Sequence, residues 1–253
     1  MLPRTSIEGR FLQMAQYLTD FSEYEAGAAP HDWVEGWVPG EQRFEVAEVP
    51  GATGGKVLQH EVFAHNRRAW AWQAVPGASE VELLTRLRTN HQDSRFGVIA
   101  RGGGENVRTT EEGVTLELFN GALRDVAEFE ADKQELRTTL FLTTYNPAME
   151  AERGPERPHG IGRNRGEHYY PWEPSTWYWL RLQVRDWDGY MAVRAKGWAD
   201  GEAEPDWKYD IQRTEPAEVG RDGWVGITGQ RTDGVREYDV FAVGTDGDPA
   251  PMP

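Results

Sequence analysis

The stretch that decides the fold is WYWLRLQVRDWDGYMAVRAKGW, which runs from Trp177 to Trp198. From Leu180 to Val184 apolar residues alternate with arginine and glutamine, a period of two that predicts a strand with one buried and one wet face. Asp188-Gly189 then interrupts the pattern, and this dipeptide between alternating segments is typical of a tight hairpin turn. The stretch therefore predicts two antiparallel strands joined by a two-residue loop.

The same rhythm extends in both directions, as short alternating segments with Gly, Pro, Asn or Asp between them. The expected strands are Arg43–Val49, Val57–His65, Ala69–Ala74, Val81–Thr89, Phe96–Arg101, Val114–Phe119, Val126–Ala131, Leu136–Thr144, Trp177–Arg185, Tyr190–Trp198, Trp207–Ile211, Trp224–Gln230 and Glu237–Val243. So many short strands and almost no helix indicate an all-β protein, a jelly-roll sandwich of two antiparallel sheets.

The first 19 residues follow a different pattern, which predicts a short helical arm. Ile7, Phe11, Met14 and Leu18 recur at helical spacing. Such an arm either packs on its own domain or docks on another subunit, and the second alternative would make the protein a homo-oligomer.

The stretch 146–175 is a long run of proline, glycine and charge that interrupts the strands. Loops of this length are usually functional or disordered. The candidates for glycan contact, taken from this loop and from the hairpin tip, are Tyr169, Tyr170, Trp172, Trp187, Arg163 and Arg165. The alternative is that the loop aromatics form a lid packed over one sheet, and that the arginines are neutralised by interleaved glutamates. Residues 246–253 are expected to form a flexible tail.

Composition excludes several classes of protein. The chain has 253 residues, with 27 basic and 42 acidic side chains, a net charge of −15, and no cysteine. Disulfides, thiol catalysis and cysteine metal sites are therefore excluded. The acidic balance argues against nucleic-acid binding. No apolar run is long enough to insert into a membrane, and we expect no secretory signal at the start.

Several segments resemble the concanavalin A-like lectin and glucanase superfamily, which includes laminin-G-like modules. They are WYWLRLQV at Trp177–Val184, MAVRAKGWADGEAEPDW at Met191–Trp207, GWVGITG at Gly223–Gly229, REYDVFAVGT at Arg236–Thr245, DFSEYEAGAAPHDWVEGW at Asp20–Trp37 and EVELLTRLR at Glu80–Arg88. The resemblance covers roughly residues 20–245 and implies one concanavalin A-like sandwich over that range. Because the superfamily includes glycan binders, hydrolases and structural modules, it implies no single function.

The segment EADKQE also resembles the catalytic pattern of laminarinase-type glycoside hydrolases. By that resemblance Glu130 would be the nucleophile, Asp132 would tune it, and Glu135 would be the acid/base. Retaining hydrolysis needs two carboxyl groups close together. Here the intervening residues are polar, so a solvated hairpin is the favoured interpretation.

Two aspartates at the hairpin turn, Asp186 and Asp188, are the candidates for a structural calcium ion, which the superfamily often holds. The DWDG sequence lacks the later ligands of a calcium loop, so a plain hairpin turn is favoured and no cofactor is expected.

The chain also resembles proteins encoded by tailed viruses. This resemblance implies a non-catalytic virion component, such as a capsid decoration, turret, tail or fibre protein, assembled in the host cytoplasm. Its expected partners are other virion subunits or itself, with host-surface glycans as a further partner. The alternative function is the laminarinase-type hydrolase.

Overall fold

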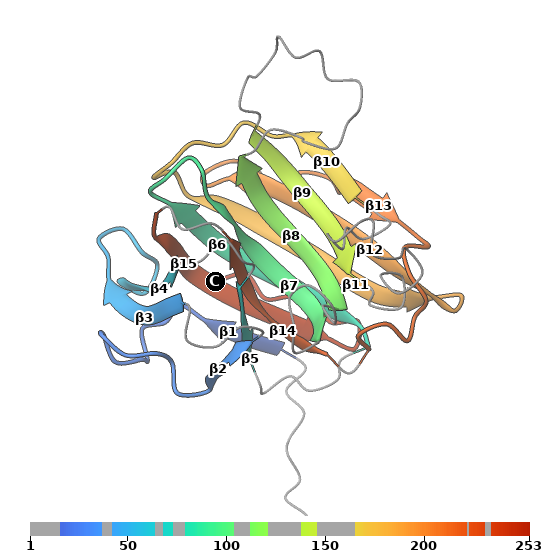
Figure 1. Cartoon of the computed structure of the whole chain (residues 1–253), viewed down its shortest axis with the longest axis horizontal. Coiled ribbons are helices and arrows are strands. Elements are labelled where there is room, and N and C mark those ends of the chain that lie inside the picture. The colour runs from blue at the N-terminus through green and yellow to red at the C-terminus, as the bar shows by residue number, and fades with distance from the viewer. Residues whose placement is uncertain are drawn as a thin grey trace, which may run out of the picture.

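A computed structural model of the protein describes residues 16–36, 42–63, 68–72, 79–103, 112–120, 138–145, 165–221, 223–230 and 234–253. The described chain forms two antiparallel sheets, which Figure 1 shows as stacked layers whose strands cross one behind the other. The eight-stranded sheet contains, in spatial order, β13 (Tyr209–Ile211), β12 (Tyr190–Ala199), β11 (Tyr178–Trp187), β6 (Val81–Thr89), β15 (Arg236–Thr245), β4 (Lys56–Val62) and β3 (Gln42–Glu48), with β1 (Gln16–Thr19) also paired to β15.

The seven-stranded sheet forms the second layer. Its order is β10 (Arg165–Tyr169), β9 (Thr138–Tyr145), β8 (Glu112–Asn120), β7 (Arg95–Gly103), β14 (Trp224–Gln230), β5 (Arg68–Trp72) and β2 (Trp33–Gly36). The described residues contain no helix, and the predicted two-sheet antiparallel sandwich is confirmed. No described helix is therefore long and apolar enough to cross a bilayer.

The hairpin predicted at Asp188-Gly189 is present. Both turn residues have positive φ angles, 51° and 77°, as a type I′ turn requires, and Trp187 pairs with Tyr190 directly across it. Along β11 the residues from Tyr178 to Val184 alternate as expected, and Leu180, Leu182 and Val184 contribute to the core between the sheets.

The outer face of the eight-stranded sheet carries a second, smaller apolar cluster. Its members are Leu84, Trp179, Trp198, Val240, Ala242 and Ala250. The two indoles are stacked, with ring centroids 6.1 Å apart and planes 14° apart. The outward face of this sheet is therefore partly covered, and the covering segment includes the end of the chain.

Two expectations for the chain ends need correction. Leu18, expected on a helix, lies in β1 and pairs with Ala242 of β15. Pairing between strands supplies the backbone hydrogen bonds that a helix would otherwise supply. Ile7, Phe11 and Met14 lie outside the described residues. The segment 246–253, expected to be a flexible tail, folds back on the sheet, and Ala250 is only 3% exposed.

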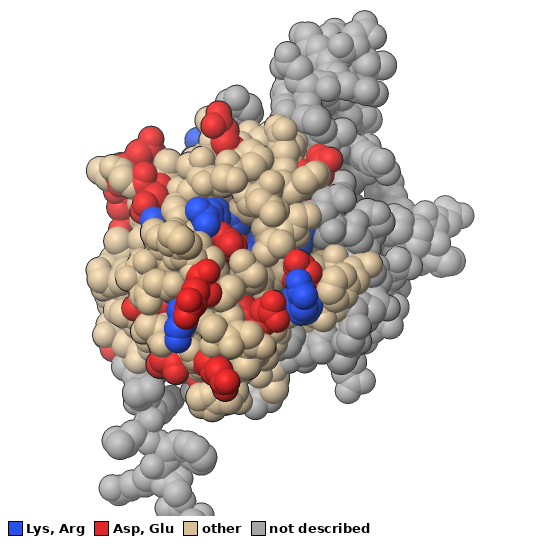
Figure 2. All heavy atoms as spheres, turned by 90° about the vertical axis from the view of Figure 1, so that its left-hand side faces the viewer, with Lys and Arg blue, Asp and Glu red and all other residues tan. Residues whose placement is uncertain are grey.

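The described surface is mixed in charge. On the face that Figure 2 presents, blue cationic side chains mostly lie beside red carboxylates, and no continuous basic surface is visible among the described residues.

Candidate functional site

The loop aromatics chosen as glycan contacts are mostly buried. Trp172 is 2% exposed, its indole N–H donates to the carbonyl of Phe119 at 3.3 Å, and its ring packs edge-on against Phe96 at 5.6 Å. Tyr170 is half-buried with its ring edge-on to Tyr178 at 6.0 Å, and burial raises the pKa of its hydroxyl. Trp172 therefore fills the core between the sheets and offers no exposed ring to a glycan, while Tyr170 packs against the edge of that core.

The other loop candidates are only partly described. Tyr169 and Arg165 lie in β10, paired with Thr139 and Thr143, but their side chains lie outside the described part of the structure. Arg163 lies outside the described residues altogether. So do Glu130, Asp132 and Glu135, and the hydrolase reading stays a prediction.

Among the aromatic residues that were predicted to contact glycans and whose side chains are described, only Trp187 is well exposed, at 48%. Tyr190, its partner across the turn, is 41% exposed, and register places both on the outer face of the eight-stranded sheet. The guanidinium of Arg185 lies over the Trp187 ring at 5.5 Å, and that of Arg213 lies over the Tyr190 ring at 5.1 Å. The hairpin tip therefore carries two exposed aromatic rings, those of Trp187 and Tyr190, each packed against one guanidinium.

The aspartates proposed for calcium are both engaged by arginine. Asp186 accepts from Arg101 at 2.5 Å and is also bonded by Arg221, while Asp188 pairs with Arg213 at 2.5 Å. Within the described ranges, no group of three or more histidine or acidic side chains could hold a metal ion. The carboxylates therefore brace the hairpin, and a calcium ion remains an untested expectation.

A cavity of about 110 Å³ lies next to the hairpin tip, where β6 begins and where β11 and β15 end. We call it the strand-end pocket. It is lined by Glu80, Val81, Glu82, Gln183, Val184, Arg185, Gly244, Gly247 and Asp248. This volume holds several water molecules or the edge of one sugar ring, and it is too small for a cofactor or a drug-sized ligand.

Donors and acceptors without partners gather around this pocket. Gln183 donates its amide to Glu82 at 2.9 Å, but its amide oxygen is buried with no partner. The Nε atom of Arg185 is likewise buried without a hydrogen bond. The carboxylates of Glu80 and Asp248 make no ion pair or hydrogen bond to any described residue. Since Gln183 Oε1 and Arg185 Nε are themselves closed to solvent, the groups open to an incoming ligand are the two carboxylates and the terminal nitrogens of the Arg185 guanidinium.

Sequence analysis missed this pocket. It is assembled from three strand ends and the C-terminal segment, and its polar groups have no shared motif. The one available signal was the polar face of β11, on which Gln183, Arg185 and Trp187 alternate with core residues.

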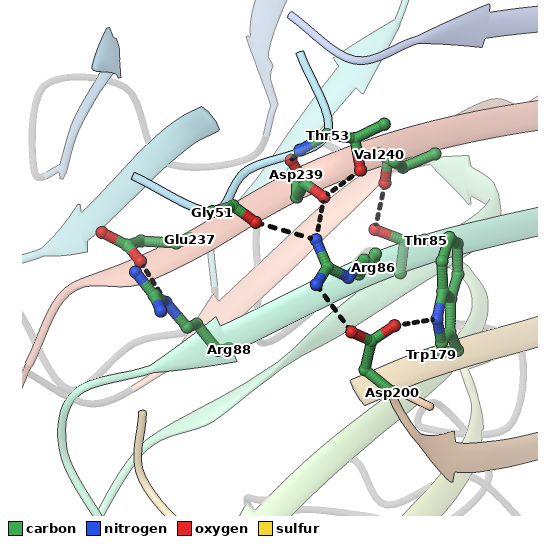
Figure 3. A network of polar contacts seen from close by, with 10 residues as sticks. All are labelled: Gly51, Thr53, Thr85, Arg86, Arg88, Trp179, Asp200, Glu237, Asp239 and Val240. Carbon is green, nitrogen blue, oxygen red and sulfur yellow. Dashed lines mark hydrogen bonds and ion pairs between the residues drawn. The ribbon is translucent and has the colours of Figure 1, made fainter. Parts of the chain in front are cut away.

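A polar network on the same outer face holds the neighbouring loops (Figure 3). The bulged residue Asp239 accepts from the backbone N–H and the hydroxyl of Thr53, both at 2.7 Å, and from Arg86 at 2.5 Å. Arg86 also donates to Asp200 at 2.7 Å, and the indole of Trp179 donates to the other oxygen of Asp200 at 2.8 Å. One guanidinium therefore joins β6 to three separate segments.

The Asp200 link makes stability depend on pH. Burial acts to raise the pKa of Asp200, but hydrogen bonds from Arg86 and Trp179 outweigh it and lower the pKa below its ordinary value of 3.8. A carboxyl group with a lowered pKa in the folded state adds stability above its unfolded pKa, and that stability is lost as pH falls through the folded pKa. We expect the urea midpoint of the wild type to fall more steeply than that of Asp200→Asn below about pH 4. Parallel curves for the two proteins would contradict this expectation.

A second charged pair lies on the outer face of the seven-stranded sheet. Glu117 is fully buried and pairs with Arg95 at 2.5 Å, and the guanidinium lies over Phe141 at 4.7 Å and Phe119 at 5.3 Å. Since the carboxylate has no access to solvent, this pair is a structural element.

Comparisons with known proteins give only distant structural likenesses. No family model matches the sequence, and no curated protein matches it. A carbohydrate-binding module, CBM66 from Bacillus subtilis, is 8% identical, with 85% of this chain and 96% of that chain covered and a TM-score of 0.46. A protein of unknown function with a galectin-like fold, also from Bacillus subtilis, is 12% identical, with coverages of 88% and 98% and a TM-score of 0.47. The catalytic domain of a GH131 β-glucanase from Podospora anserina is 11% identical, with coverages of 91% and 95% and a TM-score of 0.44. These values are too low to carry a functional argument.

Proposed function

We propose that this chain is a non-catalytic carbohydrate-binding module, and that the strand-end pocket holds the edge of a sugar ring beside Trp187. The observation that carries the proposal is the set of polar groups without partners at the pocket, the carboxylates of Glu80 and Asp248 and the guanidinium of Arg185, which also lies over the exposed ring of Trp187.

Sugar chemistry suits this arrangement. Each hydroxyl both donates and accepts a hydrogen bond, so a polyol can bond the two carboxylates and the Arg185 guanidinium together. The apolar face of a pyranose can cover the Trp187 ring, whose other interactions leave it 48% exposed. An apolar ligand would cover the two carboxylates and the guanidinium without pairing them, at a cost for each.

A pocket that contacts one sugar edge binds weakly, so several copies displayed together would gain affinity by avidity. Display on a virion, as a capsid, turret, tail or fibre component, would supply such copies. That setting rests on the sequence resemblance, and assembly through the N-terminal arm rests on the helical spacing of its apolar residues; neither rests on a feature of the described structure.

The test is a glycan array, followed by titration of the bound saccharide against Trp187→Ala. We expect the variant to weaken binding about tenfold, since loss of ring stacking removes about 1 kcal/mol or more. Its melting temperature should stay close to that of the wild type, because the side chain lies half in solvent.

The matched control is Phe63→Ala, because Phe63 is an exposed aromatic, at 58%, at the end of β4 and is separated from β11 by β6 and β15. It should bind like the wild type. An array with no bound glycan, or equal losses in both variants, would refute the proposal.

A further inference from the structure

The strand-end pocket has an excess of negative charge. Three carboxylates line it, those of Glu80, Glu82 and Asp248, against the single guanidinium of Arg185. Glu82 is already engaged, because Arg181 and the amide of Gln183 both donate to it. Two carboxylates and one guanidinium therefore remain for a ligand.

One of those two carboxylates comes from the C-terminal segment. The chain leaves β15 through Asp246 and Gly247, which have φ angles of 56° and 89°, and the N–H of Asp248 returns to the carbonyl of Thr245 at 3.0 Å. The N–H of Asp246 donates to the carbonyl of Glu80 at 3.2 Å. This tight turn brings Asp248 into the lining of the pocket.

The segment is then anchored beyond the turn. The side chain of Ala250 is buried in the outer apolar cluster with the stacked indoles, and its N–H donates to Glu82 at 3.3 Å. The carbonyl of Pro249 accepts from Gln16 of β1 at 3.0 Å. The backbone of Asp248 is thus held between a fixed turn and a fixed anchor, within the lining of the pocket.

We infer that the strand-end pocket accepts neutral and amino sugars and rejects sugars that carry a carboxylate, and that Asp248 is a specificity-determining residue. This inference rests on the proposed carbohydrate-binding function and names its ligand class. A ligand carboxylate in the pocket would face Glu80 and Asp248 with only Arg185 to offset them. A ligand ammonium would be attracted by the same two groups.

The experiment measures the affinities of glucose and galactose, their 2-amino derivatives and their 6-carboxylate derivatives. Titrations use the full chain, at low salt and about pH 6, where the amines are protonated. In whichever series binds, that of glucose or that of galactose, we expect the amino sugar to bind about three- to tenfold more tightly than the carboxylated sugar. This ratio should shrink at high salt, because exposed charges are screened.

The variant is Asp248→Asn and the matched control is Asp246→Asn. Both remove one negative charge from the same turn, but Asp246 does not line the pocket, and asparagine tolerates its positive φ. We expect Asp248→Asn to lower the ratio of amino to carboxylated affinity severalfold and Asp246→Asn to keep it.

The outcomes separate the two proposals. If a neutral sugar binds but charge makes no difference, or if the two variants behave alike, the inference on specificity fails and the proposed function stands. If carboxylated sugars bind more tightly than amino sugars, the inference is overturned. If none of the six sugars binds and no glycan is retained on the array, both fail.

Discussion

Replacing Asp239 with alanine is expected to destabilise the protein by about 3–5 kcal/mol, the usual cost of breaking a buried ion pair from one side. The Asp239 side chain is fully buried, and it binds both Arg86 and Thr53. Its loss would leave the guanidinium of Arg86, which is 11% exposed, with Asp200 as its sole carboxylate partner, and would orphan the N–H of Thr53. Urea denaturation at neutral pH measures the change in the free energy of unfolding.

Two further variants give this prediction its controls. Asp239→Asn keeps the side-chain shape and an acceptor for Thr53 but removes the charge, so it should lose less stability than alanine. Arg43→Ala breaks an ion pair with Glu61 in which the arginine side chain is 54% exposed, and it should cost at most about 1 kcal/mol. A loss for Asp239→Ala no larger than that of Arg43→Ala would show that the network contributes little.

Gly97→Ala is expected to destabilise the protein by about 3 kcal/mol or more, or to prevent folding. A Cβ atom at Gly97 would collide with the backbone carbonyl of Leu116 and lie 2.7 Å from the Cα of Glu117. Both atoms belong to β8, which pairs with β7 within the seven-stranded sheet, so relief would require the two strands to move apart. Yield of folded protein and urea denaturation both measure the effect.

The control for this prediction lies on the same strand. A Cβ atom at Gly103 would meet only the Glu112 side chain, whose nearest oxygen is 3.0 Å away and can rotate aside. Gly103→Ala should therefore change stability by about 1 kcal/mol or less. Similar losses at the two glycines would mean that the close approach of β8 at Gly97 is not what limits the substitution.

The strand pattern was readable because alternation is a local property. In β11 the inward residues from Tyr178 to Val184 are apolar and the Asp188-Gly189 turn has the φ angles that its sequence demands, so the hairpin followed from adjacent residues alone. The strands β1, β2 and β10 were missed. Each has at most five residues, too few to show a period, and they are defined by their pairing with longer strands.

The bulge in β15 shows where local pattern stops being informative. The register shifts between Tyr238 and Val240, so Asp239 and Val240 both lie on the outer side while Tyr238 and Phe241 contribute to the core. A strict alternation would have placed Asp239 and Val240 on opposite faces. The Arg86 network depends on this one extra residue.

The sequence by itself determined an all-β chain, its main hairpin and an exposed tryptophan at the hairpin tip, since these depend on the period of side chains along one strand. Only the tertiary structure decided that Trp172 is buried, that Tyr170 is half-buried and that a pocket forms near Trp187. That pocket joins Glu82 to Gln183, 101 residues away, and to Ala250, 168 residues away. Contacts between residues so far apart in the sequence are set by how the strands pair and how the C-terminal segment folds back, and no local pattern of residues encodes them.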